Sequence, residues 1–218
     1  MGKEEGIKKE LLQSIIQYVR DNHKDDIDKA YEYFWDEEEP AERLKGTALE
    51  LGFINFEDWL LFDYKTADAR QTFIDIYIDK TEELKEEEIG VLRKISDSVL
   101  SLYEVISVSK DKSIVLKDLL LGDEYSVRDK VLTRGLNKGD VFATRLLNLD
   151  GKHVMSVCVY PFTASQKKDV LNTVQKQFAR YRKNVKEDGT MREYLKDYGD
   201  VFNLSWMHHC FNPISEKH

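Results

Sequence analysis

The chain has 218 residues, of which 34% are charged and 41% are apolar. A chain of this length can bury a sizeable core in one domain or two. No apolar run is long enough to span a bilayer, and the charged N-terminus lacks the apolar segment of a signal peptide. We therefore expect a cytoplasmic protein without membrane contact, in which Cys158 and Cys210 are reduced thiols.

Charge is distributed unevenly along the chain, although the net charge is only −8. Residues 1–101 carry 14 Lys and Arg against 26 Asp and Glu, whereas residues 102–162 carry 9 against 8 and residues 163–218 carry 10 against 7. We divide the chain at the same positions into a helical module (1–101), a small β-barrel (102–162) and C-terminal helices (163–218). Such polarity bears on partners and docking.

The first segment has the apolar periodicity of helices. We expect helices over 3–21, 28–35, 40–51 and 72–79, a short one capped by Asn55, and one that begins at Thr81. Pro40 suits the first position of a helix, and Gly52 suits its end. The Ile and Tyr content of 72–79 would also support a strand. The expected result is an all-helical module of five or six helices.

The middle segment alternates apolar and polar residues, as half-buried strands do. Five strands are expected, over 102–109, 113–121, 124–131, 141–149 and 152–160. Asp150-Gly151 is the strongest hairpin signal, since a type I′ turn needs positive φ at both central residues. Pro161 should end the last strand. The predicted fold class is α+β, with a central five-stranded antiparallel barrel, SH3-like or OB-like, between helical segments.

The last segment returns to helical periodicity. Ser165 could cap a long helix that reaches about Lys186, with Val170, Leu171, Val174, Phe178 and Tyr181 facing inward. A second helix should begin after Thr190, because Thr190 and Glu193 have the spacing of a capping box.

Four passages resemble a group of poorly characterised bacterial proteins, many of which carry a C-terminal SEC-C zinc knuckle. They are FEDWLLFDY at 56–64, SLYEV at 101–105, LKDLLLGDEYSV at 116–127 and LNKGDVFATR at 136–145. The resemblance covers about residues 50–162 and implies a helical region followed by a β region. The knuckle itself is absent, because this chain has no Cys-x-Cys, so the adaptor role of the knuckle does not carry over.

The predicted helix at 165–186 is strongly basic, with seven Lys and Arg against Asp169 alone. A basic helix beside a small barrel suggests contact with RNA or the ribosome, through Lys167, Lys168, Arg180, Arg182 and Lys183. The competing interpretations are a solvated face or a helix docked on the acidic first segment. The net charge of the whole chain disfavours nucleic acid.

Metal-capable side chains are densest at His208, His209 and Cys210, with His218 beyond them. Adjacent helical residues point about 100° apart, so one ion cannot be shared unless the helix has ended. We predict no metal or cofactor. We interpret these residues as a cluster at a helix end, and a zinc site is the alternative.

Glu57, Asp58 and Asp63 flank an apolar segment, and such surroundings can raise a carboxyl pKa for acid–base work. Acids on the wet face of an amphipathic helix are the more common case. No catalytic motif is present. We therefore predict a non-enzymatic protein–protein interaction or regulatory module, with Trp59, Phe62 and Tyr64 as its interaction surface. An RNA- or ribosome-associated protein is the first alternative, and a hydrolase with an acidic site is the second.

Overall fold

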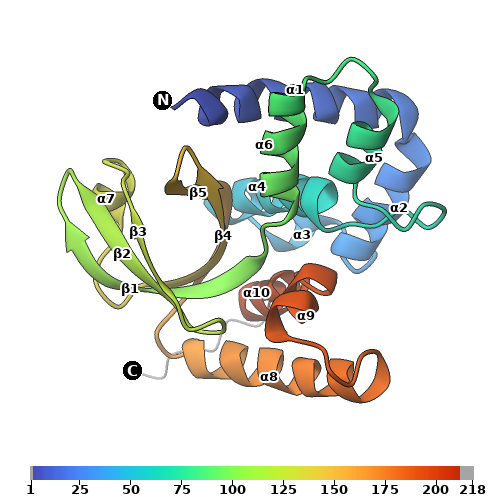
Figure 1. Cartoon of the computed structure of the whole chain (residues 1–218). Coiled ribbons are helices and arrows are strands. Elements are labelled where there is room, and N and C mark those ends of the chain that lie inside the picture. Colours follow the sequence, from blue (N-terminus) through green and yellow to red (C-terminus); the bar gives the residue numbers. More distant parts are fainter. Residues whose placement is uncertain (1, 212–218) are drawn as a thin grey trace.

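The computed structural model describes residues 2–211, in which ten helices accompany one five-stranded sheet (Figure 1). The predicted α+β class is confirmed. Within this part of the chain no helix combines the length and the apolar character needed to cross a membrane.

Six helices precede the sheet: α1 (Lys3–Asn22), α2 (Lys24–Phe34), α3 (Pro40–Arg43), α4 (Thr47–Phe62), α5 (Phe73–Lys80) and α6 (Glu86–Ser96). The predicted helix break at Gly52 is wrong, because α4 runs through it. A Cβ at Gly52 would lie 2.6 Å from Cη2 of Trp35, so this glycine is needed for close packing of Trp35 on α4. Asn55 does not cap a helix either; it is fully buried in the middle of α4. Residues 73–80 are helical, not a strand.

The strands are β1 (Leu100–Ser109), β2 (Ser113–Asp118), β3 (Glu124–Val127), β4 (Val141–Leu149) and β5 (Lys152–Phe162), with the short helix α7 (Leu132–Gly135) between β3 and β4. Asp150 and Gly151 have φ values of 50° and 67°, which confirms the predicted turn. Pro161 does not end β5, since it still lies opposite Phe142 of β4.

The strands pair in the order β1-β2-β3-β5-β4, and β4 also pairs with β1, so the order closes into a barrel. The prediction that all pairs are antiparallel is wrong, because β3 and β5 pair in parallel through Val127 and His153. Two antiparallel neighbours run in opposite directions, so strand direction alternates around a closed ring of antiparallel pairs. Such alternation is possible only with an even number of strands. A closed ring with an odd number of strands must therefore contain at least one parallel pair. A closed five-stranded barrel therefore cannot be antiparallel throughout.

Three helices follow the sheet: α8 (Lys167–Asn184), α9 (Met191–Asp197) and α10 (Val201–Phe211). The predicted capping box is present, with the Thr190 side chain accepting from the backbone N–H of Glu193. In Figure 1, α9 and α10 lie between α8 and the rest of the molecule. Because α10 packs on β5 and α9 on β1, these helices cover part of the outside of the sheet.

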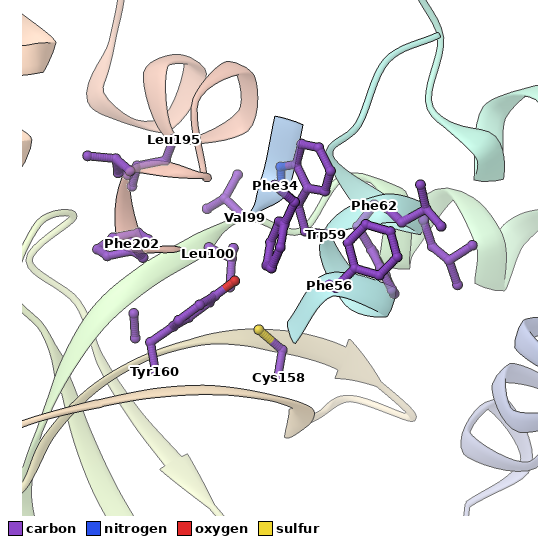
Figure 2. Packing of buried hydrophobic residues seen from close by; sticks show 14 of the residues in the cluster. Phe34, Phe56, Trp59, Phe62, Val99, Leu100, Cys158, Tyr160, Leu195 and Phe202 are labelled. Atoms are coloured by element: carbon purple, nitrogen blue, oxygen red, sulfur yellow. The ribbon is translucent and has the colours of Figure 1, made fainter. Parts of the chain in front are cut away.

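One large apolar core runs through the chain from Leu11 to Met207 and crosses both predicted boundaries, at 101 and 162. In Figure 2, Phe34, Phe56 and Trp59 from the first helices face Tyr160 of β5, and Phe202 of α10 approaches from the other side. A second, smaller core fills the inside of the barrel, with Tyr103, Val105, Ile114, Leu116, Val127 and Phe142. The helical segments are thus packed on the outside of the barrel through shared side chains.

Candidate functional site

The three aromatic residues predicted as an interaction surface do not form one. Trp59 and Phe62 are only 5% and 3% exposed, and Tyr64 is half-buried. The physical reason is that α4 lies between α2 and β5, so its aromatic side chains pack inward on both sides. These residues belong to the large core (Figure 2).

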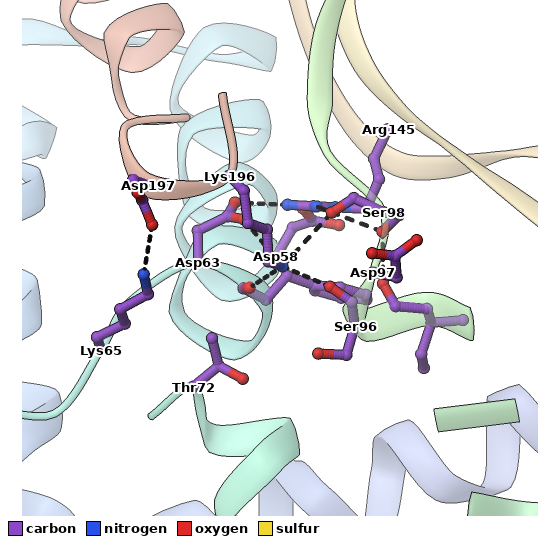
Figure 3. Close-up of polar contacts among 12 residues, drawn as sticks. Asp58, Asp63, Lys65, Thr72, Ser96, Asp97, Ser98, Arg145, Lys196 and Asp197 are labelled. Atoms are coloured by element: carbon purple, nitrogen blue, oxygen red, sulfur yellow. Dashed lines mark hydrogen bonds and ion pairs between the residues drawn. The ribbon is translucent and has the colours of Figure 1, made fainter. Parts of the chain in front are cut away.

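Two of the three carboxylates considered for acid–base work, Asp58 and Asp63, belong to a buried charge cluster with Arg145 and Lys196 (Figure 3). The guanidinium of Arg145 donates from Nε to Asp58 Oδ2 at 3.1 Å and from Nη2 to Asp63 Oδ2 at 2.5 Å. Nη1 donates to the backbone carbonyl of Ser98 at 2.8 Å. The Arg145 side chain has no exposed surface. One arginine from β4 thereby joins α4 to the start of β1.

Lys196 of α9 completes this cluster from the C-terminal side. Its Nζ donates to the backbone carbonyls of Phe62 at 3.0 Å and Ser96 at 2.5 Å, and lies 3.9 Å from Oδ1 of Asp63. The negative charges of the two carboxylates equal the positive charges of Arg145 and Lys196. The cluster therefore connects all three predicted segments without a net charge.

Burial has opposite effects on the groups of this cluster. It raises the pKa of Asp58, an effect that the charge of Arg145 opposes, and it lowers the pKa of Lys196. Burial also acts to lower the pKa of Arg145, but the charges of Asp63 and Asp58 outweigh it, so this pKa is raised. Both carboxylates are closed off from solvent and are balanced by Arg145 and Lys196 together, which suits a structural cluster. Glu57, by contrast, is exposed and paired with Arg20 at 3.4 Å.

The three candidate metal ligands lie in the last turns of α10 and do not converge. His208 is exposed, His209 is half-buried against the ring of Phe162, and Cys210 packs against the large core. Between residues 2 and 211 no three His, Cys, Asp or Glu side chains are grouped so as to hold a metal ion. His218 lies outside the described residues.

The basic residues predicted to bind nucleic acid all lie on α8 or at its start, but they differ in environment. Lys167 is paired with Glu104 of β1 at 2.8 Å. Arg182 donates to the backbone carbonyl of Glu187, and Arg180 contacts only the Gln177 amide. Lys168 and Lys183 are exposed. The basic side of α8 therefore faces solvent and is not docked on the acidic first segment.

The clearest surface feature was missed from the sequence: an aromatic pocket of about 310 Å³ between α8, α9, α10 and the end of α2. Its floor includes Tyr181 and Tyr194, which are 5% and 2% exposed. The lining residues are Tyr33, Gln177, Arg180, Tyr181, Asn184, Val185, Tyr194, Tyr198, Asp200, Val201 and Leu204.

The tyrosines of the aromatic pocket are held by their neighbours. Tyr194 and Tyr198 stack with ring centroids 5.7 Å apart and planes inclined by 19°. Tyr33 stacks on Trp59 at 5.7 Å and donates from its hydroxyl to Asp200 Oδ2 at 2.6 Å. Burial, followed by the charge of Asp200, raises the pKa of Tyr33, so the phenol stays protonated at neutral pH. Ring stacking and this hydrogen bond thus fix the positions of these tyrosines in the structure.

The mouth of the aromatic pocket carries several exposed apolar side chains. Eight large apolar side chains among the described residues are exposed, and four of them line this pocket: Tyr33, Val185, Tyr198 and Leu204. Tyr198 directly follows α9 and Leu204 lies in α10, and neither residue type marks a surface position in the sequence. One sequence signal could have indicated the pocket: residues 201–207 carry apolar side chains on nearly every side of the helix. Contact with the core covers only one side, so some of these side chains must lie elsewhere.

The fold and this pocket describe an α+β protein with a tyrosine-lined pocket on its surface. The chain belongs to a family of unknown function, DUF7986, whose model matches residues 8–199. The match includes most of the aromatic pocket, while Asp200, Val201 and Leu204 lie just beyond it. No curated protein and no solved structure matches the chain.

Proposed function

We propose that this protein is a non-enzymatic protein-interaction module that binds a segment of a partner protein in the aromatic pocket. The observation that carries the proposal is the gathering of half of the exposed large apolar side chains around one concave site. Clustered exposed apolar residues typically mark interaction sites, whereas single ones need no explanation.

The composition of the pocket favours a protein ligand. Tyrosine and arginine are enriched in the residues that dominate binding energy at protein interfaces, and the pocket offers four tyrosines and Arg180. Its volume suits one apolar or aromatic side chain of a partner. Gln177 and Asn184 at the edge can form hydrogen bonds with the backbone of the bound segment.

Oligonucleotide binding is the second candidate, and the strand order favours it. β4 lies beside β1 in the order β4-β1-β2-β3, which is a Greek key, and OB-like five-stranded barrels of this kind bind oligonucleotides. We propose the OB-like alternative over the SH3-like one on this ground. The net charge of −8 opposes a polyanion, so we rank this function second. A relationship to SEC-C-bearing proteins stays a prediction.

A random-peptide library displayed on phage and selected on the full chain tests the leading proposal. We expect enriched peptides that share an aromatic or leucine anchor. Leu204→Glu should weaken their binding by about tenfold or more, because it places a charge at the apolar mouth of the pocket. Binding is measured by fluorescence anisotropy.

Val131→Glu is the matched control, since Val131 is an exposed apolar residue next to α7 and does not line the pocket. Its binding should equal that of the wild type. A selection that enriches no common anchor, or peptides that bind the Leu204→Glu variant as tightly as the wild type, would refute the proposal.

A further inference from the structure

The aromatic pocket has a row of cations along one side, formed by Lys176, Arg180 and Lys183, which we call the basic stripe. The spacings of four and three residues place these side chains on one face of α8. Arg180 also lines the pocket, together with Gln177 and Asn184 from the neighbouring positions. The stripe and the pocket are therefore adjacent faces of the same helix.

The basic stripe lacks internal carboxylate partners. Among the described residues, none of its three side chains forms an ion pair, whereas Lys167 pairs with Glu104 and Lys186 with Glu193 at the two ends of α8. Asp169, the one acidic residue of α8, lies in the first turn, about two turns from Lys176. Three like charges on one face repel one another. An approaching carboxylate relieves that repulsion.

We propose that the partner segment carries acidic residues next to its apolar anchor, and that the basic stripe selects them. This inference rests on the proposed function and adds the chemistry of the partner: an apolar or aromatic side chain in the pocket, with Asp or Glu beside it over α8. Lys and Arg on a rim increase the association rate of an acidic ligand and orient it, and the apolar anchor supplies most of the affinity.

A short acidic segment fits these charges better than RNA does. The stripe presents three cations, and the first 101 residues carry a large excess of acidic side chains. A polyanion that extends beyond the stripe would meet that excess, whereas a peptide with two or three carboxylates would not.

The test uses the peptides selected from the phage library, resynthesised with Asp→Asn and Glu→Gln changes outside the anchor. We expect the selected peptides to be enriched in Asp and Glu beside the anchor. Loss of these charges should weaken binding by about tenfold, and raised salt should remove most of that difference. Anisotropy at low and high salt measures both effects.

The double variant Lys176→Glu/Lys183→Glu keeps every residue that lines the pocket and reverses the stripe. It should bind the amide peptides as the wild type does, and the acidic peptides at least tenfold more weakly. The matched control is Lys110→Glu/Lys112→Glu, in the exposed turn after β1, where an equal charge change should have little effect.

The outcomes separate the two proposals. Anchored peptides without enrichment in acids, or equal binding of acidic and amide forms, would overturn the acidic selection and leave the interaction function standing. A failure to select any anchored peptide that depends on Leu204 would overturn the function itself. A fluorescent uridine oligonucleotide that binds through Lys176 and Lys183 more tightly than the acidic peptides would overturn this inference in favour of RNA.

Discussion

The side-chain amide of Asn55, in the middle of α4, forms two hydrogen bonds with the backbone of Val159 in β5. Nδ2 donates to the carbonyl of Val159, and Oδ1 accepts from its N–H, both at 2.9 Å. The contact lies beside the irregularity at which the register of β5 against β4 shifts, between the pairs Thr144–Val159 and Leu146–Met155. A bulge locally interrupts the hydrogen bonds between two strands. Here the side chain of Asn55 forms hydrogen bonds with both the N–H and the carbonyl of Val159.

Asn55→Ala should therefore destabilise the protein by on the order of 2 kcal/mol, because it leaves two part-buried backbone groups of Val159 without their partner. Urea unfolding measures the loss, and hydrogen exchange at the Val159 amide should become faster. Asn172→Ala, on the exposed side of α8, should change stability by less than about 0.5 kcal/mol. Unchanged exchange at Val159 would contradict this prediction.

Arg145→Met should be among the most destabilising single changes in the chain, by about 3–5 kcal/mol. The variant leaves Asp58 and Asp63 buried without the guanidinium that is hydrogen-bonded to both of them. The midpoint of urea unfolding gives the magnitude. Neutralising the partners as well, by Asp58→Asn and Asp63→Asn in the Arg145→Met background, should recover part of the loss.

The control for Arg145 is Arg134→Met, which removes an exposed ion pair with Asp111. Exposed pairs contribute about 0–1 kcal/mol, so this variant should remain close to the wild type. If both variants lost the same stability, the buried cluster would not have the structural role assigned to it.

Gly52→Ala and Gly90→Ala should have opposite effects although both glycines lie in helices. Alanine is favoured over glycine inside a helix by roughly 0.5–1 kcal/mol, and the Cβ of Gly90 would meet nothing within 4 Å. Gly90→Ala should raise the melting temperature. A Cβ at Gly52 would collide with Trp35, so Gly52→Ala should lower it. A rise in both variants would show that Trp35 can move away at little cost.

The capping of α9 should weaken in acid through Glu193. Its pKa is lowered to about 2, first by the hydrogen bond from Lys186 and then by the hydrogen bonds from Thr190. A depressed pKa means that the charged form stabilises the fold above the ordinary value of 4.5, and that this contribution is lost as the pH falls towards 2. Glu193→Gln should reduce stability at pH 7 more than in acid. Denaturant unfolding of the variant and the wild type at pH 7 and in acid measures this difference. An equal loss of stability under the two conditions would contradict the prediction.

The sequence alone identified most elements, because their signals are local. The period of the apolar residues located α1, α5, α8 and the strand segments, and Asp150-Gly151 marked its turn through a backbone conformation that few residue pairs adopt. The Thr190 capping box could be predicted as well, because it depends only on residues three positions apart in the sequence. The prediction at Gly52 was wrong. A glycine often ends a helix, but here it lies inside α4 because Trp35, at the end of α2, packs closely against it.

The aromatic pocket could not be predicted from local signals in the sequence, because it depends on which surfaces the fold leaves uncovered. Trp59 and Phe62 have the character of interface residues but are covered by α2 and β5, while Tyr198 and Leu204 have the character of core residues and remain exposed.

The order of residues thus determined which segments are helices or strands and where charge accumulates along α8. Tertiary structure alone decided that the barrel closes with a parallel pair, that Arg145 bridges two buried acids beside Lys196, and that four tyrosines from distant segments line one pocket. The physical reason is that periodicity specifies which side of an element is apolar, whereas burial depends on the element that packs against it.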